Sequence, residues 1–419
     1  MNPLMTSPNK RSLSVRLHNF LRSLKAMFQI AFITTLNATV GALFRWRLAN
    51  AIAKGDTLWL DDLESTNRKH EFDAALPKAD IRPNQAKRSK KSRAMKLKAY
   101  PEPTYPFAYR ELPTSGNWIN GLGESTVRPA SKVFHTITGD TPWNGLERFN
   151  QVTTSWAALR LLFNVIWQDR HRDGMISAEK HPVNDPAQMA THVKEAAKQF
   201  GAALVGITDI PAAYTFEQFD PAPYTSAICI GVPMELEAIY HAPTQRSSVA
   251  AIAAYDQVSA ASVALAQRIR QLGWNALAAS NLGHDTDEVL HLPLAIQAGL
   301  GQLGKHGSII TKELGSNLRL ATVLTDMPLA HDKPIDIGVD DFCARCQICT
   351  SNCPPQAIFD DKQMVRGIEK WYVDFDKCAP YFAANHSCGI CVAVCPWTAP
   401  GRGESISLKM LAQRAEKER

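Results

Sequence analysis

Cysteine is almost absent from most of this 419-residue chain, because only Cys229 precedes residue 343. The other eight cysteines fall between Cys343 and Cys395. A disulfide framework is spread over the fold of a small secreted domain, so this distribution argues against one. Crowding at short fixed intervals is instead typical of metal ligation.

A strong overall charge bias is also missing. Hydrophobic residues make up 45% and charged residues 21%, with a net charge of +6. This composition excludes a disordered chain, and the length allows two or three domains with their own cores. The basic excess gathers between Lys87 and Lys98, a stretch without acidic residues. Prolines flank it, so we interpret it as a solvated linker; contact with nucleic acid or an anionic membrane is the alternative.

The N-terminal region lacks a clear targeting signal. Residues Ala26 to Phe44 are uncharged, but they are barely long enough to span a membrane and include several polar side chains. No small-residue cleavage site follows, and Lys10-Arg11 is not a twin-arginine pair. An ordinary helix packed on the protein, a membrane-associated segment and an export signal all stay open. We assign residues 1–75 to a helical basic region and 76–115 to a Pro- and Lys-rich linker.

Helix and strand patterns alternate from about residue 185. Asp185-Pro186 predicts a helix start and Gly201 the end of that helix. The apolar runs Ala203–Ile207 and Ala227–Val232 predict buried strands. One face of a later helix that ends at Gly273 is marked by Val258, Ala261, Leu265, Ile269 and Leu272. This alternation predicts a layered sheet with helices packed on it.

The clustered cysteines form two motifs. The first reads Cys343-x2-Cys346-x2-Cys349-x3-Cys353-Pro, and the second reads Cys388-x2-Cys391-x3-Cys395-Pro with Cys378 ten residues upstream. In the bacterial ferredoxin spacing, three cysteines hold one 4Fe–4S cluster and the fourth ligates the other cluster. We therefore assign Cys343, Cys346, Cys349 and Cys395 to one cluster, and Cys353, Cys378, Cys388 and Cys391 to the other.

Zinc is the alternative metal, but zinc sites pair two C-x2-C elements and rarely use two such complete runs. Cys229 lies in an apolar run and is interpreted as a small core residue. Two clusters carry electrons without performing a reaction of their own. We therefore expect the electrons to reach a redox centre in the α/β domain.

Three stretches before the clusters resemble one known family. They are Ala298-Gly-Leu-Gly-Gln-Leu-Gly-Lys-His-Gly307, Thr322–Leu329 and Asp332–Val339, which runs into the first motif. Together with the ending Cys388-Gly-Ile-Cys-Val-Ala-Val-Cys-Pro-Trp397, they resemble the cobalamin-dependent reductive dehalogenases over roughly residues 185 to 400. The Gly-Lys-His and Cys-Pro-Trp elements are shared with the related epoxyqueuosine reductases. The Asp-Lys-Pro-Ile-Asp element favours the dehalogenases.

The resemblance implies a fold of the α+β or α/β class. A nitroreductase-like domain over residues 116–335 would bind cobalamin base-off, and a bacterial ferredoxin-like domain over 336–400 would hold the two 4Fe–4S clusters. Residues 401–419 would form a C-terminal tail. Close backbone approach to a bulky ligand explains the glycine-rich stretch, so the expected cofactor-binding residues are Gly299, Gly301, Gly304, His306 and Gly307. This stretch lacks the spacing of a dinucleotide-binding loop.

The resemblance also implies catalytic roles. Tyr255 would donate the proton that replaces the halide, because a cation beside a phenol stabilises the phenolate that is left. Lys305 is the expected cation, with Arg319 as the second choice, and Asn281 matches an asparagine that lies near the tyrosine in the family.

The expected substrate is a small organohalide. No fused reductase domain follows before Arg419, so a separate ferredoxin or flavoprotein would supply electrons. We expect a cytoplasmic protein whose N-terminal region can dock on the membrane face, without a nucleic-acid partner. Two alternatives stay open: an epoxyqueuosine-reductase-like enzyme acting on tRNA, with Asp256 as the acid, and a non-catalytic electron-transfer subunit.

Overall fold

The structure is a computed structural model of the whole chain. The residues that it describes are 114–129, 131, 133, 142–143, 155–216, 219–279 and 288–418. The basic N-terminal region, the run from Lys87 to Lys98 and Asn281 lie outside them, so the expectations for these segments stay predictions.

An antiparallel four-stranded sheet forms the centre of the first domain. The strand order is β1-β2-β6-β3, and the strands are β1 (Leu204–Thr208), β2 (Ser226–Pro233), β6 (Leu318–Thr325) and β3 (Ala276–Ala278). The two predicted strands are β1 and β2 within one residue at each end. Strands β2 and β6 lie in the middle and are buried along nearly their whole length, as the continuous apolar runs require.

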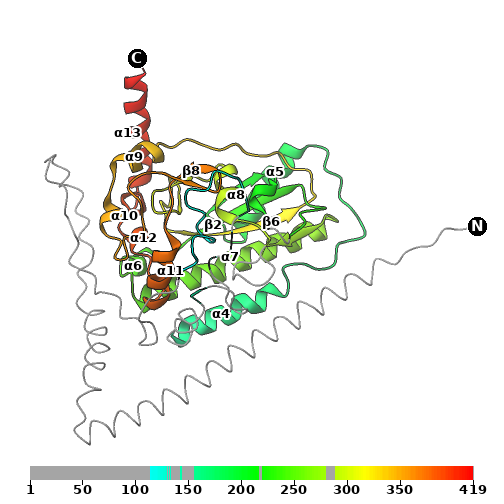
Figure 1. The fold of residues 1–419 in the computed structure, drawn as a ribbon. Helices are drawn as coiled ribbons and strands as arrows, with labels where there is room; N and C mark the ends of the chain where they lie inside the picture. Colours follow the sequence, from blue (N-terminus) through cyan, green and yellow to red (C-terminus); the bar gives the residue numbers. More distant parts are fainter. Residues whose placement is uncertain are drawn as a thin grey trace, which may run out of the picture.

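Helices cover both faces of this sheet (Figure 1). Helix α7 (Gln245–Gln271) crosses one face, where Val258, Leu265 and Ile269 are buried as predicted. Helices α4 (Trp156–Asp169) and α5 (Pro186–Gln199) pack on α7, and α8 (His291–Gln297) covers the opposite face. Asp185 caps α5, and Gly201 and Gly273 adopt positive φ just after α5 and α7, which is why these helices end there.

Helix α7 also has the length and apolar composition of a membrane-crossing helix, alone among the described helices. Half of its most apolar window is buried inside the protein. Its contacts with the sheet and with α4 account for this apolar character without a membrane.

Short elements fill the rest of the described chain. In the first domain these are η2 (Ala212–Tyr214), α6 (Leu236–Ile239), β4 (Gln302–Leu303) and β5 (Ile309–Ile310). The cysteine-rich region contains α9 (Val339–Arg345), α10 (Ile348–Ser351), β7 (Gln363–Val365), β8 (Ile368–Lys370), α11 (Phe375–Ala384), α12 (Ile390–Ala393), η3 (Pro396–Thr398) and α13 (Arg402–Lys417). Within residues 401–419, expected as a tail, Arg402–Lys417 thus form a helix. Ile406 and Met410 of α13 pack into the same core as Cys343, Cys395 and Trp397.

The segment around residues 115–122 belongs with the cysteine-rich region rather than with the sheet. The side chain of Asn120 donates a hydrogen bond to Asp374 over 2.9 Å, and the backbone N–H of Ser115 donates to Asp376 over 2.5 Å. Leu122 forms an isolated bridge with Val365. Residues expected to begin the cofactor-binding domain therefore support the start of α11, which carries Cys378.

Candidate iron–sulfur and catalytic sites

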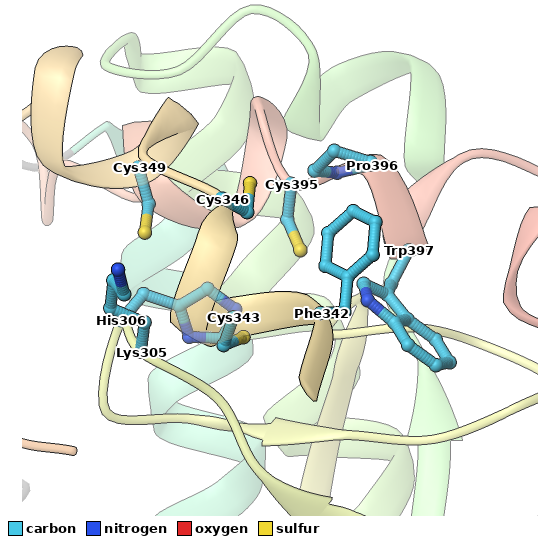
Figure 2. Close-up of a pocket in the computed structure, with 9 residues that line it drawn as sticks. All are labelled: Lys305, His306, Phe342, Cys343, Cys346, Cys349, Cys395, Pro396 and Trp397. Carbon is cyan, nitrogen blue, oxygen red and sulfur yellow. The ribbon is translucent and has the colours of Figure 1, made fainter. Parts of the chain in front are cut away.

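The four cysteines that the spacing assigns to the first cluster surround one cavity. Figure 2 shows their side chains around the cavity, and the other lining residues come from three places in the chain: Lys305 and His306, Phe342, and Pro396 and Trp397. The cysteines are Cys343, Cys346, Cys349 and Cys395. Burial raises the pKa of the Cys343 thiol to about 11 and that of Cys349 further. These thiols hold their protons until a metal displaces them.

The second set of cysteines lies next to the first. Cys353, Cys378 and Cys391 pack on one small apolar core formed by Ala357, Ile358 and Val373, together with Cys349. Burial, followed by the neighbouring thiolates of Cys378 and Cys353, raises the pKa of Cys391 to about 12. Burial and the Cys391 thiolate raise the pKa of Cys388 as well. Cys353 thus leaves the first loop and joins the second set, as the ferredoxin spacing requires.

The turn before α12 holds a strained backbone. His386, Ser387 and Cys388 have positive φ values of 48°, 61° and 31°, and Gly389 follows with 84°. Non-glycine residues in this region cost about 1–3 kcal/mol each and persist only where the surroundings enforce them. Because Cys388 lies in this turn, bonds from its thiolate to a cluster would help to hold the conformation.

A cubane and a single metal ion require different separations between their ligands. In the described part of the chain, no three His, Cys, Asp or Glu side chains stand close enough together to hold one metal ion. The thiolates of a 4Fe–4S cubane bind four different irons, so they stand further apart than four ligands of one zinc ion.

The glycine-rich stretch forms a hairpin whose glycines are explained by internal packing. A Cβ on Gly301 would collide with the carbonyl oxygen of Ile310, and one on Gly299 would lie 2.6 Å from that of Lys333. A Cβ on Gly304 or Gly307 would likewise come within 2.9 Å of a side chain of this protein. Packing within the protein therefore accounts for each of these glycines, and the expectation that the stretch also approaches a bulky ligand stays a prediction.

Both ring nitrogens of His306 form hydrogen bonds within the protein. Its Nδ1 accepts a hydrogen bond from the backbone N–H of Ser308 over 3.2 Å, so its Nε2 carries the proton and donates it to Ser316 Oγ over 2.8 Å. Burial lowers the pKa of His306 to about 4. The ring is a neutral structural support beside the first cysteine cavity, and neither nitrogen is free for a cofactor.

Tyr255 and Arg319 lie together on the face of the sheet that α7 covers. The guanidinium carbon of Arg319 is 4.8 Å from the centroid of the Tyr255 ring, and its buried Nε has no hydrogen-bond partner. Arg319 alternates along β6 with Leu318 and Leu320 and shares its face with Ala321 and Val323, which pack in the core under α7. The tyrosine lies inside α7, ten residues after its first residue, Gln245.

Lys305 lies at the first cysteine cavity rather than beside Tyr255. Its side chain lines the first cysteine cavity, and its Nζ is 4.9 Å from the ring centroid of Trp371. The structure therefore gives Tyr255 the second-choice cation, Arg319, and gives Lys305 to the iron–sulfur region. Sequence spacing could not separate the two, because both follow Tyr255 in the chain and only the packing of β6 on α7 selects one.

Asp256 points away from this pair. It accepts a hydrogen bond from the side chain of Gln168 on α4 over 2.7 Å. Adjacent helix residues project about 100° apart, so Tyr255 faces β6 while Asp256 joins the two helices.

Comparisons with known proteins show what this chain is similar to. Residues 342–399 match a family model described as a 4Fe-4S dicluster domain. The tetrachloroethene reductive dehalogenase of Sulfurospirillum multivorans is 31% identical over 261 residues, which are 51% of this chain and 51% of that protein. One from Desulfitobacterium hafniense is 36% identical over 185 residues, 41% of this chain and 33% of that protein.

Over this part of its length the chain is similar to the reductive dehalogenases. It spans about half the length of the curated relatives it matches. The structure of a catabolic reductive dehalogenase in complex with 3-bromo-4-hydroxybenzoic acid superimposes with a TM-score of 0.61 at 22% identity, covering 73% of this chain and 47% of that one. The epoxyqueuosine reductase of Aliivibrio fischeri is 30% identical over 148 residues, 31% of this chain and 35% of that enzyme.

The reductive dehalogenase resemblance predicted from the sequence is thus confirmed, together with its epoxyqueuosine reductase relatives. So is the coarse architecture, a mixed α/β domain followed by a region that matches an iron–sulfur dicluster domain. The dicluster match extends over both cysteine sets, which supports two clusters rather than one.

Proposed function

We propose that this protein reductively dehalogenates a small organic halide. Two 4Fe–4S clusters, held by the two cysteine sets, would pass electrons one at a time to cobalamin bound base-off in a nitroreductase-like α/β domain. The observation that carries this proposal is the Arg319 guanidinium over the Tyr255 ring. It places a positive charge beside a tyrosine that can donate a proton.

The reaction needs two electrons and one proton for each carbon–halogen bond that becomes a carbon–hydrogen bond, with release of a halide ion. Bound cobalamin would supply a low-valent metal that reacts with carbon–halogen bonds, which iron–sulfur clusters do not. The protein supplies position, electrons and the proton.

Tyr255 is the proposed source of the proton. When its hydroxyl gives up a proton, a phenolate remains on a ring that faces a guanidinium. The nearby positive charge stabilises this anion, so proton donation becomes easier. The unpaired Nε of Arg319 adds to this view, because a buried donor without a partner is costly unless a ligand or an anion uses it.

The position of Asp256 disfavours the tRNA-modifying alternative. That alternative requires Asp256 to act as the acid, but its carboxylate is hydrogen-bonded to Gln168 between two helices. The residue oriented toward a cation is Tyr255, the acid of the dehalogenase proposal.

The deciding experiment combines metal content and product release. The chain is purified without oxygen from cells supplied with cobalamin, and iron, cobalt and the EPR spectrum are measured. We expect about eight irons, one cobalt and a base-off cob(II)alamin signal, followed by halide release from chlorinated or brominated phenols and ethenes with a chemical reductant.

Controls separate the alternatives. The variant Y255F should keep iron and cobalt but lose halide release, whereas D256N should keep all three. Full iron without cobalt after reconstitution would leave an electron-transfer subunit, and modification of epoxyqueuosine tRNA without halide release would establish the second enzyme class.

A separate ferredoxin or flavoprotein in the cytoplasm is the proposed electron donor, with the N-terminal region docking the protein on the membrane face. Deleting residues 1–75 tests the docking, since partitioning onto anionic vesicles should fall. Unchanged partitioning would contradict it.

A further inference from the structure

Lys305 places a buried amino group at the first cysteine cavity. Only 1% of the residue is exposed, and its Nζ is buried without any hydrogen-bond partner. It lines the cavity with the four cysteines of the first set, as Figure 2 shows. Its Nζ also lies 4.9 Å from the centroid of the Trp371 ring.

The acidic residue near this site, Asp340, interacts with side chains other than Lys305. Asp340 forms an ion pair with Lys362 over 2.7 Å and accepts a hydrogen bond from Trp371 Nε1 over 2.7 Å. Among the described residues, Lys305 has no ion pair with a carboxylate. A buried ammonium without a counter-charge is strongly disfavoured, so the cavity fits an anionic occupant.

A 4Fe–4S cluster held by four thiolates is such an occupant. Its thiolates outweigh the positive charge of the core, and reduction adds one more negative charge. The buried side chain of Lys305 lines the same cavity as Cys343, Cys346, Cys349 and Cys395. Its charge would therefore act directly on a cluster held by these four thiolates.

We propose that Lys305 is a redox-tuning residue, whose charge raises the reduction potential of the cluster at Cys343, Cys346, Cys349 and Cys395 above that of the second cluster. The proposal rests on the iron–sulfur part of the proposed function and is independent of cobalamin and substrate. An extra electron is stabilised by a nearby cation, and the effect is large where water is excluded. Charge and hydrogen bonds near the sulfurs are known to set cluster potentials.

The second set of cysteines has a different cation. The charge of Lys377 contributes a minor lowering of the pKa of Cys353, whose overall rise comes from burial. The Lys377 side chain is 53% exposed, and its Nζ lies 3.6 Å from Asp374. Solvent and this carboxylate screen its charge, so it provides a matched control on a lysine near the other cluster.

The test is an EPR-monitored redox titration of the anaerobically purified full chain. Lys305→Met removes the charge, Lys305→Arg keeps it, and Lys377→Met is the control. The variant Cys346→Ser changes one ligand of the first cluster and so identifies which signal belongs to it.

We expect K305M to reduce the ratio of reduced to oxidised first cluster about tenfold at a fixed potential, which is about 59 mV for a one-electron couple. The second cluster should keep its potential, and K305R and K377M should stay close to wild type. Should K305M lose iron, K305Q replaces it in the same comparison with K305R.

Two results would overturn the inference: unchanged potentials in the neutral variants at full iron content, or an equal shift of both clusters. Failure of the dehalogenase proposal is recognised separately, because full iron with no cobalt or no halide release leaves the titration fully measurable. A wild-type chain that cannot hold iron would overturn both.

Discussion

Replacing Arg319 with methionine removes the cation from the ring of Tyr255 while keeping an unbranched side chain on β6. The guanidinium carbon lies 4.8 Å from the ring centroid, and much of a phenolate's charge lies on its oxygen. Two unit charges 4.8 Å apart would interact by about 3.5 kcal/mol at an effective dielectric constant of about 20, which serves as an upper bound. Tyr255 is half-buried and the proton is only partly transferred in the transition state, so we discount this to about 2 kcal/mol. That corresponds to a loss of about 30-fold in rate.

The assay is single-turnover halide release without oxygen, at matched iron and cobalt content. The variant R319K keeps a charge on β6 and should lose less than R319M. Y255F removes the proposed proton donor and should lose about 10²–10⁴-fold. If the two residues act together, R319M should cost little more in the Y255F background, because residues in contact do not add independently.

Halide release by R319M at the wild-type rate would contradict a role for Arg319 in proton donation. Losses from R319M and Y255F that multiply in the double variant would contradict it as well, since Arg319 would then act on something other than the tyrosine. D256N, which leaves the Tyr255–Arg319 pair in place, should stay within a few-fold of wild type.

Three further predictions concern stability and reactivity. Burial raises the pKa of the Cys229 thiol to about 12, so mass spectrometry should find it unmodified by iodoacetamide in the native chain and alkylated after unfolding. Gly301→Ala should lower the free energy of unfolding by about 1–3 kcal/mol, seen as a lower Tm, because a Cβ there collides with Ile310; an unchanged Tm would contradict this packing. The Arg414 hydrogen bond lowers the pKa of Asp336 from 3.8, so the pair stabilises the fold above that pH and loses its effect as the pH falls below it. Urea unfolding at neutral pH should show a cost of about 0.5–1 kcal/mol for R414Q, and this cost should vanish in acid.

The sequence alone determined the features that depend on neighbours close in the chain. Helix α5 begins at Asp185 because the carboxylate caps it, and α7 ends before Gly273 because a glycine accepts positive φ. The three cysteines of one short loop stay together in any fold of that loop, so their spacing was enough to predict a cluster. The fourth cysteine of each set comes from the other motif, and the ferredoxin spacing predicted this exchange as well.

Only the tertiary structure decided which cation lies beside Tyr255. Arg319 faces α7 because β6 pairs with β2 in a register that places Arg319 opposite Val232. A shift of one residue would turn its side chain to the other face of the sheet, and no local pattern reveals that register. The hairpin β4–β5 packs its glycines on the protein itself and places Lys305 at the cysteine cavity, and the C-terminal residues become helix α13 because Ile406 and Met410 find an apolar surface beside the first cluster. These outcomes depend on surfaces that come from distant parts of the chain, and such surfaces meet only once the whole domain has folded.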